Sequence, residues 1–128
     1  MPDEPMDSER VAYFAALYDA FNARDADAVL ARTTDDVDWP NAWEGGRLRG
    51  QDAVRDYWNR QWREIDPRVQ PLAVEVRGDR TVAVTVRQEV RSRDGQPLST
   101  GEVLHVYTLR DGPSGAELIE RMDVEEPI

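Results

Sequence analysis

The chain has 128 residues and a formal net charge of −10, because 26 acidic residues outnumber 16 basic ones, all of them arginine. Its 40% hydrophobic content can fill the core of one domain, whereas a strongly acidic chain is a poor partner for nucleic acid or an anionic membrane surface. The absence of cysteine excludes disulfides, thiol nucleophiles, thiolate zinc sites and iron–sulfur clusters.

The chain contains no segment near the roughly 20 apolar residues of a membrane span, and its first residues lack the features of a signal peptide. We therefore expect a cytoplasmic protein with neither a nucleic-acid nor a membrane partner. Residues 1–6 have the composition of a flexible leader, and residues 7–128 are expected to form a single domain.

Helical periodicity governs the first half of the chain. Apolar residues recur at helical spacing from Val11 onward, after Asp7, which is a suitable N-cap. The expected elements are a helix at about 7–23, a short helix capped by Asp25, an extended segment at 37–39, a loop at 41–50, and a third helix that Asp66-Pro67 terminates.

In the second half the hydrophobic period changes to two, which predicts strands. Glycine-containing turns separate them, at Gly78, Gly95 and Gly112. Helices followed by an antiparallel meander indicate an α+β fold with the helices packed on one face of the sheet. The expected strands are 72–76, 82–90, 102–109 and 117–125.

Several short motifs follow one another in a characteristic order. They are Tyr18…Phe21-x-x-x-Asp25-x-Asp27-Ala28, Asp36-Val37-Asp38-Trp39-Pro40, Gly50-x-x-Ala53-Val54, His105-Val106-Tyr107, and Leu118-Ile119 with Asp123. Over about residues 10–126 this order resembles the SnoaL-like branch of the nuclear transport factor 2-like superfamily. The resemblance implies a curved, mostly antiparallel sheet wrapped with three N-terminal helices into a cone around an apolar pocket, and commonly a dimer through the sheet. The same cone hosts isomerases, dehydratases, cyclases, hydrolases and non-catalytic proteins, so it does not fix the reaction.

Alternation along the strands predicts which polar side chains enter the cone. If the valines of 82–90 face the helices, Gln88 must face them too. The same alternation along the expected strands 102–109 and 117–125 predicts that four more polar side chains face the helices. The expected inward set is Gln88, His105, Tyr107, Arg121 and Asp123.

This register leaves an apolar group on the outer face of the sheet. A surface of that kind is too hydrophobic to remain in water, so we expect a homodimer through it. Its members are Leu104, Val106, Leu118, Met122 and Val124.

Aromatic residues are candidates for the pocket wall. Trp58 and Trp62 lie at helical spacing, so simple core packing is the alternative for both. In the isomerase relatives a helix-one tyrosine is an oxyanion donor, and the resemblance places Leu17 there with Tyr18 one step away. The candidate wall residues are Trp39, Trp43, Trp58, Tyr13 and Tyr57.

His105, the only histidine, and Asp123 are the candidate catalytic residues, as a carboxylate–imidazole pair for general acid–base chemistry. The structural alternatives are a neutral imidazole satisfied by a neighbour and a salt bridge between Asp123 and Arg121. Arg121 would either neutralise Asp123 or bind an anionic or enolisable oxygen.

The relatives differ in how well they match. Ketosteroid isomerases place an aspartate immediately before the proline where this chain has Trp39, and the Arg-x-Asp pattern of limonene epoxide hydrolases lacks its partner aspartate here, so both activities are disfavoured. Polyketide cyclases combine a histidine on the penultimate strand with an aspartate on the last, which matches His105 and Asp123.

The leading hypothesis is therefore an enzyme that needs neither cofactor nor metal, binds a small apolar cyclic molecule with a carbonyl or hydroxyl group, and moves a proton. An isomerase, cyclase or dehydratase type of reaction fits. The alternative is a non-catalytic ligand-binding or dimerisation module in which His105, Asp123 and Arg121 form a structural network. The chain lacks a G-x-S-x-G elbow, a usual zinc ligand set and a calcium loop.

Overall fold

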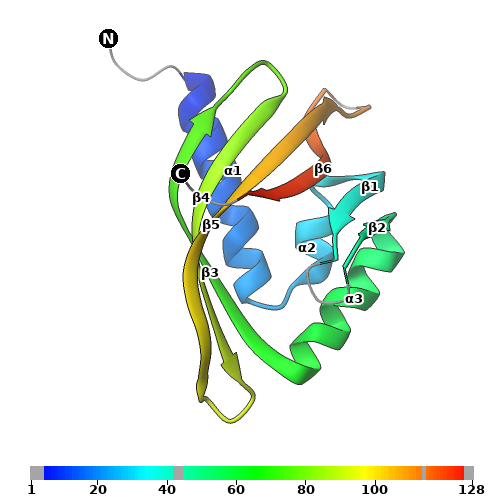
Figure 1. Ribbon diagram of the computed structural model, residues 1–128. Coiled ribbons are helices and arrows are strands. Elements are labelled where there is room, and N and C mark those ends of the chain that lie inside the picture. The colour runs from blue at the N-terminus through cyan, green and yellow to red at the C-terminus, as the bar shows by residue number, and fades with distance from the viewer. Residues whose placement is uncertain (1–4, 42–44, 114, 126–128) are drawn as a thin grey trace.

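The computed structural model describes residues 5–41, 45–113 and 115–125. Three helices and six strands form the α+β fold that the sequence predicts (Figure 1). In chain order they are α1 (Pro5–Asn22), α2 (Ala26–Leu30), β1 (Thr33–Pro40), β2 (Arg47–Arg49), α3 (Gln51–Glu64), β3 (Ile65–Val76), β4 (Thr81–Ser92), β5 (Pro97–Asp111) and β6 (Glu117–Glu125).

The sheet has the order β2-β1-β6-β5-β4-β3, with antiparallel pairing except between β1 and β6. Its long strands β3, β4 and β5 curve around α1, and α3 closes the other side beside β1 and β2 (Figure 1). The concave face and the helices enclose the core, which is the cone that the sequence predicts.

Local signals account for the helix boundaries. The Asp25 carboxylate accepts a hydrogen bond from the Ala28 amide at 3.1 Å and so caps α2, as expected. Gly50 precedes α3 with a φ of 92°, a backbone conformation that favours glycine. α1 begins at Pro5, two residues before the predicted start, and residues 1–4 of the expected leader lie outside the described residues.

β1, β3, β4 and β5 are longer than the periodicity predicts, whereas β6 has the predicted bounds. The polar run at 33–36, expected to end a helix, lies in β1, where pairing with β6 satisfies the backbone. Pro67 and Pro71 lie within β3, which is tolerated because β3 is an edge strand. Tertiary pairing therefore overrides the local turn signals at both places.

One irregularity decides which face of β6 meets the core. Leu109 pairs with Ile119, whereas the preceding Thr108 pairs with Arg121, so Glu120 is an extra residue in β6. A bulge of this kind shifts the alternation of side chains by one position. Beyond it Met122 and Val124 face the helices, and Arg121 and Asp123 face outward.

Candidate functional site

A cavity of about 140 Å³ lies between the helices and the concave face of the sheet. Every element of the cone except β2 contributes to its lining. The residues that line it are Leu17, Tyr18 and Phe21 of α1, Val29 of α2, Trp39 and Pro40 of β1, Tyr57, Trp58 and Gln61 of α3, Ile65, Pro67 and Val69 of β3, Gln88 and Val90 of β4, His105 and Tyr107 of β5, and Met122 and Val124 of β6.

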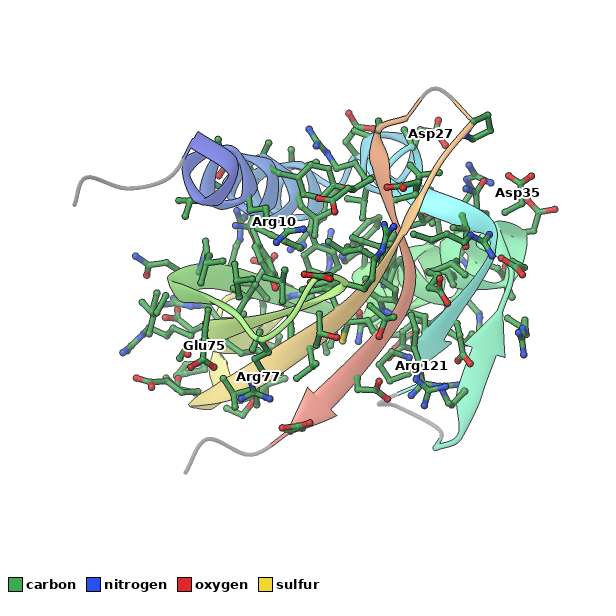
Figure 2. The ribbon with its side chains drawn as sticks, turned by 90° about the horizontal axis from the view of Figure 1, so that it is seen from above. Arg10, Asp27, Asp35, Glu75, Arg77 and Arg121 are labelled. Carbon is green, nitrogen blue, oxygen red and sulfur yellow. The ribbon has the colours of Figure 1, made fainter. Side chains whose placement is uncertain are left out.

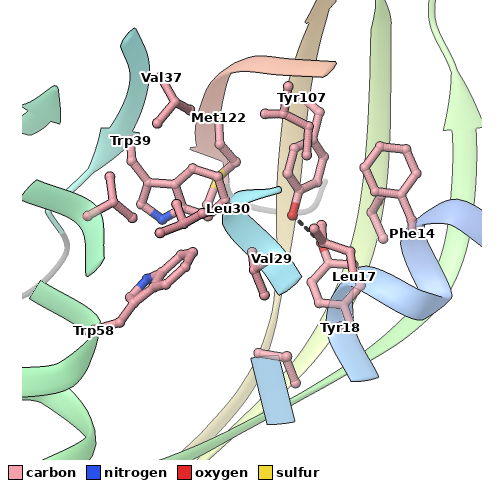
Figure 3. Packing of buried hydrophobic residues seen from close by; sticks show 14 of the residues in the cluster. Phe14, Leu17, Tyr18, Val29, Leu30, Val37, Trp39, Trp58, Tyr107 and Met122 are labelled. Carbon is pink, nitrogen blue, oxygen red and sulfur yellow. Dashed lines mark hydrogen bonds between the residues drawn. The ribbon is translucent and has the colours of Figure 1, made fainter. Parts of the chain in front are cut away.

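Three hydrogen-bonded side chains form the buried polar end of the cavity. The Tyr18 hydroxyl lies 2.9 Å from Nδ1 of His105. It also lies 2.7 Å from the hydroxyl of Tyr107 (Figure 3). All three residues are at most 8% exposed. We call Tyr18, His105 and Tyr107 the polar triad.

The polar triad is uncharged at neutral pH. Burial lowers the pKa of His105 to about 4 and raises the pKa values of Tyr18 and Tyr107 well above the ordinary value. Within the described part of the chain the cavity lining contains neither carboxylate nor guanidinium groups. The site therefore offers neutral hydrogen-bonding groups to an apolar space.

The tautomer of His105 determines what the triad presents to a ligand. Nδ1 is occupied by Tyr18, while Nε2 has no hydrogen-bond partner among the described residues. If Tyr107 donates to Tyr18 and Tyr18 donates to Nδ1, then Nε2 carries the proton and is a donor. If Nδ1 of His105 instead donates to Tyr18 and Tyr18 donates to Tyr107, Nε2 is unprotonated and is an acceptor.

Aromatic rings form another part of the cavity wall, and Trp39 lies beside Tyr107 of the triad with ring centroids 6.3 Å apart. Trp39 and Trp58 meet edge to face, with ring centroids 5.4 Å apart, and both line the cavity (Figure 3). Trp62 stacks behind Trp58 at 6.0 Å and lies under the guanidinium of Arg24, outside the lining. The packing interpretation therefore applies to Trp62, whereas Trp58 both packs and lines the cavity.

The expected pairing of His105 with Asp123 is wrong. Asp123 lies outside the cavity, where its carboxylate accepts hydrogen bonds from Arg121 at 2.9 and 3.0 Å and from Arg47 at 3.1 Å. These hydrogen bonds, chiefly those from Arg121, hold the pKa of Asp123 below its ordinary value. The cause is the bulge at Glu120, which reverses the alternation on which the prediction depended.

Arg121 is likewise not a pocket residue. It lies on the side of the sheet away from α1 (Figure 2), and it bridges Asp123 and Asp38. Arg47 also contacts both aspartates, so Asp38, Arg47, Arg121 and Asp123 form an alternating ion network on the outer surface. The salt-bridge alternative for Asp123 and Arg121 is the one the structure contains.

Tyr13 does not line the cavity either. Its hydroxyl lies 3.1 Å from the carbonyl oxygen of Arg32 and 3.3 Å from that of Glu117, and its ring lies under the Arg32 guanidinium. Backbone carbonyls next to β1 and β6 thus hold it at the other end of α1. Trp43 lies outside the described residues.

The remaining predicted residues do line the cavity: Leu17, Trp39, Tyr57, Trp58, Gln88, His105 and Tyr107. Sequence reasoning missed Tyr18, although it lies on the same apolar helix face as Phe14 and is adjacent to Leu17. It also missed Phe21 and Gln61, for which helical spacing was the available signal. Met122 and Val124 were assigned to the outer face for the same reason that Asp123 was assigned inward.

Sequence comparison identifies the family. The family described as SnoaL-like domain matches residues 14–113. This chain belongs to the SnoaL-like family. No curated protein sequence is significantly similar to this SnoaL-like chain.

Solved structures share the fold of this SnoaL-like domain. TerC, co-crystallised with polyporic acid, is 24% identical with a TM-score of 0.74, and the match covers 91% of this chain and 90% of TerC. An NTF2-like protein of unknown function from Burkholderia pseudomallei is 23% identical with a TM-score of 0.71, covering 87% and 85%. A protein from Catenulispora acidiphila in complex with S-DNPA is 17% identical with a TM-score of 0.73, covering 94% and 92%. These matches confirm the nuclear transport factor 2-like cone.

Two other kinds of site are absent from the described residues. Within residues 5–41, 45–113 and 115–125, no group of three or more potential metal-ligating side chains comes together. None of the helices in these ranges is long and apolar enough to cross a membrane.

Proposed function

We propose that this protein binds a small, uncharged cyclic molecule in the cavity, with a carbonyl or hydroxyl oxygen of the ligand hydrogen-bonded to Nε2 of His105. The observation that carries the proposal is an apolar, aromatic-walled cavity with an uncharged polar triad at its buried end. Such pockets use a few well-placed polar groups to orient an otherwise apolar ligand.

The size of the cavity supports a ring-sized ligand. Its volume of about 140 Å³ is close to that of the roughly 150 Å³ apolar cavity known to hold benzene. Edge and face contacts with Trp39 and Trp58 favour a flat ring. TerC, which shares the fold and was co-crystallised with polyporic acid, supports a small organic ligand by analogy.

A ligand carbonyl bound at His105 would favour loss of a proton from the adjacent carbon, without a cofactor, as in isomerases, cyclases and dehydratases. The described lining supplies no carboxylate, so solvent would take up that proton. With a pKa of about 4, His105 is a weak base, since about 3 pKa units below neutrality corresponds to about 4 kcal/mol of lost driving force. A neutral imidazole that donates from Nε2 instead stabilises negative charge developing on a carbonyl oxygen. We therefore assign His105 the role of hydrogen-bond donor, positioned by Tyr18.

The second candidate function is non-catalytic binding of the same ligand class. It is favoured by the absence of a carboxylate from the described lining, because proton removal from carbon usually requires a base in contact with the ligand. The two candidates share the ligand and differ in whether the protein accelerates a reaction.

Deuterium exchange separates them. The bicyclic ketone 2-tetralone has exchangeable hydrogens beside its carbonyl, and NMR in D₂O measures their loss. Catalysis predicts exchange at least about tenfold faster with the wild-type protein than with His105→Phe, since one oxyanion donor is worth about 10²-fold or more in established sites. Asp123→Asn is the matched control and should exchange at the wild-type rate. Binding without faster exchange would support the non-catalytic function.

We further propose that the protein forms a homodimer through the outer sheet face. Leu104, Val106 and Leu118 support it, although Met122 and Val124 belong to the cavity rather than to this face. Val106 lies on this face between Ala83 of β4 and Asp123 of β6.

A further inference from the structure

Gln88 is a polar residue of the cavity that the polar triad does not use. It lies on the concave face of β4 between Val69 of β3 and Gly101 of β5. Its side-chain amide has no hydrogen-bond partner among the described residues. Its partner Gly101 carries no side chain, and a Cβ added there would meet open space.

Gln88 lies far from the polar triad along the same face. Gly101, its partner on β5, is four residues from His105, which corresponds to about 13 Å at 3.3 Å per residue. Val86 and Val84 occupy the inward positions of β4 along this path and are fully buried. Exposure increases from these valines to the half-buried Gln88, so Gln88 lies toward the mouth of the cavity.

The cavity thus has an unpartnered hydrogen-bonding group at each end, Nε2 of His105 and the Gln88 amide, whereas the Gln61 amide in the lining donates to the Tyr57 hydroxyl at 3.3 Å. An unpartnered amide that is half-buried beside apolar residues loses hydrogen bonds to water as a ligand enters, unless the ligand replaces them. A ligand that is apolar at the Gln88 end is therefore bound less well than one with a matching polar group.

Resting on the proposed function, we infer that the ligand is an elongated molecule of at least two rings, with one oxygen at His105 and a second hydroxyl or carbonyl group at the opposite end bound by Gln88. The first ring fills the enclosed volume lined by Trp39 and Trp58, and the second extends toward the mouth. The amide of Gln88 can both donate and accept, so it accommodates either group.

Two probes that differ by one hydroxyl test the inference. 4-Phenylphenol has one hydroxyl, and 4,4′-biphenol has an identical second hydroxyl at the far end of the same two rings. Calorimetric titration should give a threefold to tenfold tighter Kd for 4,4′-biphenol, the range that one net neutral hydrogen bond provides.

Two matched variants test whether Gln88 causes the preference for 4,4′-biphenol over 4-phenylphenol. Gln88→Leu should reduce the preference to the about twofold statistical advantage of the symmetric 4,4′-biphenol and should tighten binding of 4-phenylphenol, because the unpartnered amide is gone. Gln70→Leu, the same change at an exposed position of the neighbouring strand, should preserve the preference. A wild-type preference of no more than about twofold, or a larger preference that survives Gln88→Leu, would overturn the inference.

The proposed function has a separate outcome in the same titration. His105→Phe should weaken binding of both probes, because both place a hydroxyl at the polar triad. If 4-phenylphenol binds equally well to His105→Phe, or if neither probe binds the wild-type protein, the proposed function fails and this inference fails with it.

Discussion

The Tyr18 hydroxyl on α1 lies 2.9 Å from Nδ1 of His105 on β5, so a helix residue occupies one nitrogen of the imidazole and leaves the other for a ligand. The same hydroxyl is 2.7 Å from that of Tyr107, which places Tyr18 at the centre of the polar triad. Its removal affects both neighbours at once.

Tyr18→Phe should therefore destabilise the protein more than Tyr107→Phe. It leaves His105 Nδ1 and the Tyr107 hydroxyl without their partner, at about 1–3 kcal/mol for each buried polar group left unsatisfied. Urea unfolding measures the difference. Tyr107→Phe retains the Tyr18–His105 hydrogen bond, so ¹⁵N NMR should show the wild-type imidazole tautomer in that variant and a changed tautomer balance in Tyr18→Phe. Indistinguishable stabilities and spectra would exclude a positioning role for Tyr18.

The stability of the fold should depend on pH through His105. Because burial lowers its pKa from 6.5 to about 4, the unfolded chain takes up a proton as pH falls through 6.5 and the folded chain does so only near 4. The contribution of neutral, buried His105 to stability is thus fully present above about pH 6.5 and is lost as the pH falls toward 4. The free energy of unfolding should decrease by about 2 kcal/mol between pH 7 and pH 5.

His105→Phe is the reference for that pH dependence, since it retains every carboxylate. The difference between the two proteins in urea unfolding isolates the histidine. An identical slope in both proteins between pH 7 and pH 5 would show that His105 titrates at an ordinary pKa.

Asp123→Asn should leave ligand binding unchanged. Its carboxylate belongs to the outer ion network with Arg121 and Arg47, not to the cavity. The side chain is 34% exposed, so its loss should reduce stability by no more than about 1 kcal/mol. Calorimetric titration with 4-phenylphenol should give a Kd within twofold of wild type. A loss of binding comparable to that of His105→Phe would show that Asp123 belongs to the binding site.

Val106→Asp tests the proposed dimer. A carboxylate at this 8% exposed position would add a second negative charge opposite Asp123 and remove an apolar contact from the outer face, and we expect at least a tenfold weaker association. Sedimentation at micromolar concentrations checks it, with circular dichroism to confirm folding. Monomeric wild-type protein under these conditions would refute the proposal.

Periodicity predicted most of the fold because each half of the chain has one dominant period. Three helices, the antiparallel meander and the inward positions of Gln88, His105 and Tyr107 follow from it. β2 was missed because its three residues lie among glycines and depend on pairing with β1.

The errors in the site have one main physical cause. Alternation along β6 holds only in a regular strand, and the extra Glu120 opposite β5 has no signature in a single sequence. That one residue exchanges Arg121 and Asp123 with Met122 and Val124, and turns an expected charged site into an uncharged one. Tyr13 was misplaced for a different reason, since nothing local indicates that backbone carbonyls of Arg32 and Glu117 hold its hydroxyl.

A crystal structure of the protein with bound 4-phenylphenol tests the central claim most directly. We predict the phenol ring against Trp39 and Trp58, with its oxygen within hydrogen-bond distance of Nε2 of His105. A ligand whose oxygen contacts the Arg47, Arg121 and Asp123 network instead, or a cavity closed by its own side chains, would contradict the account.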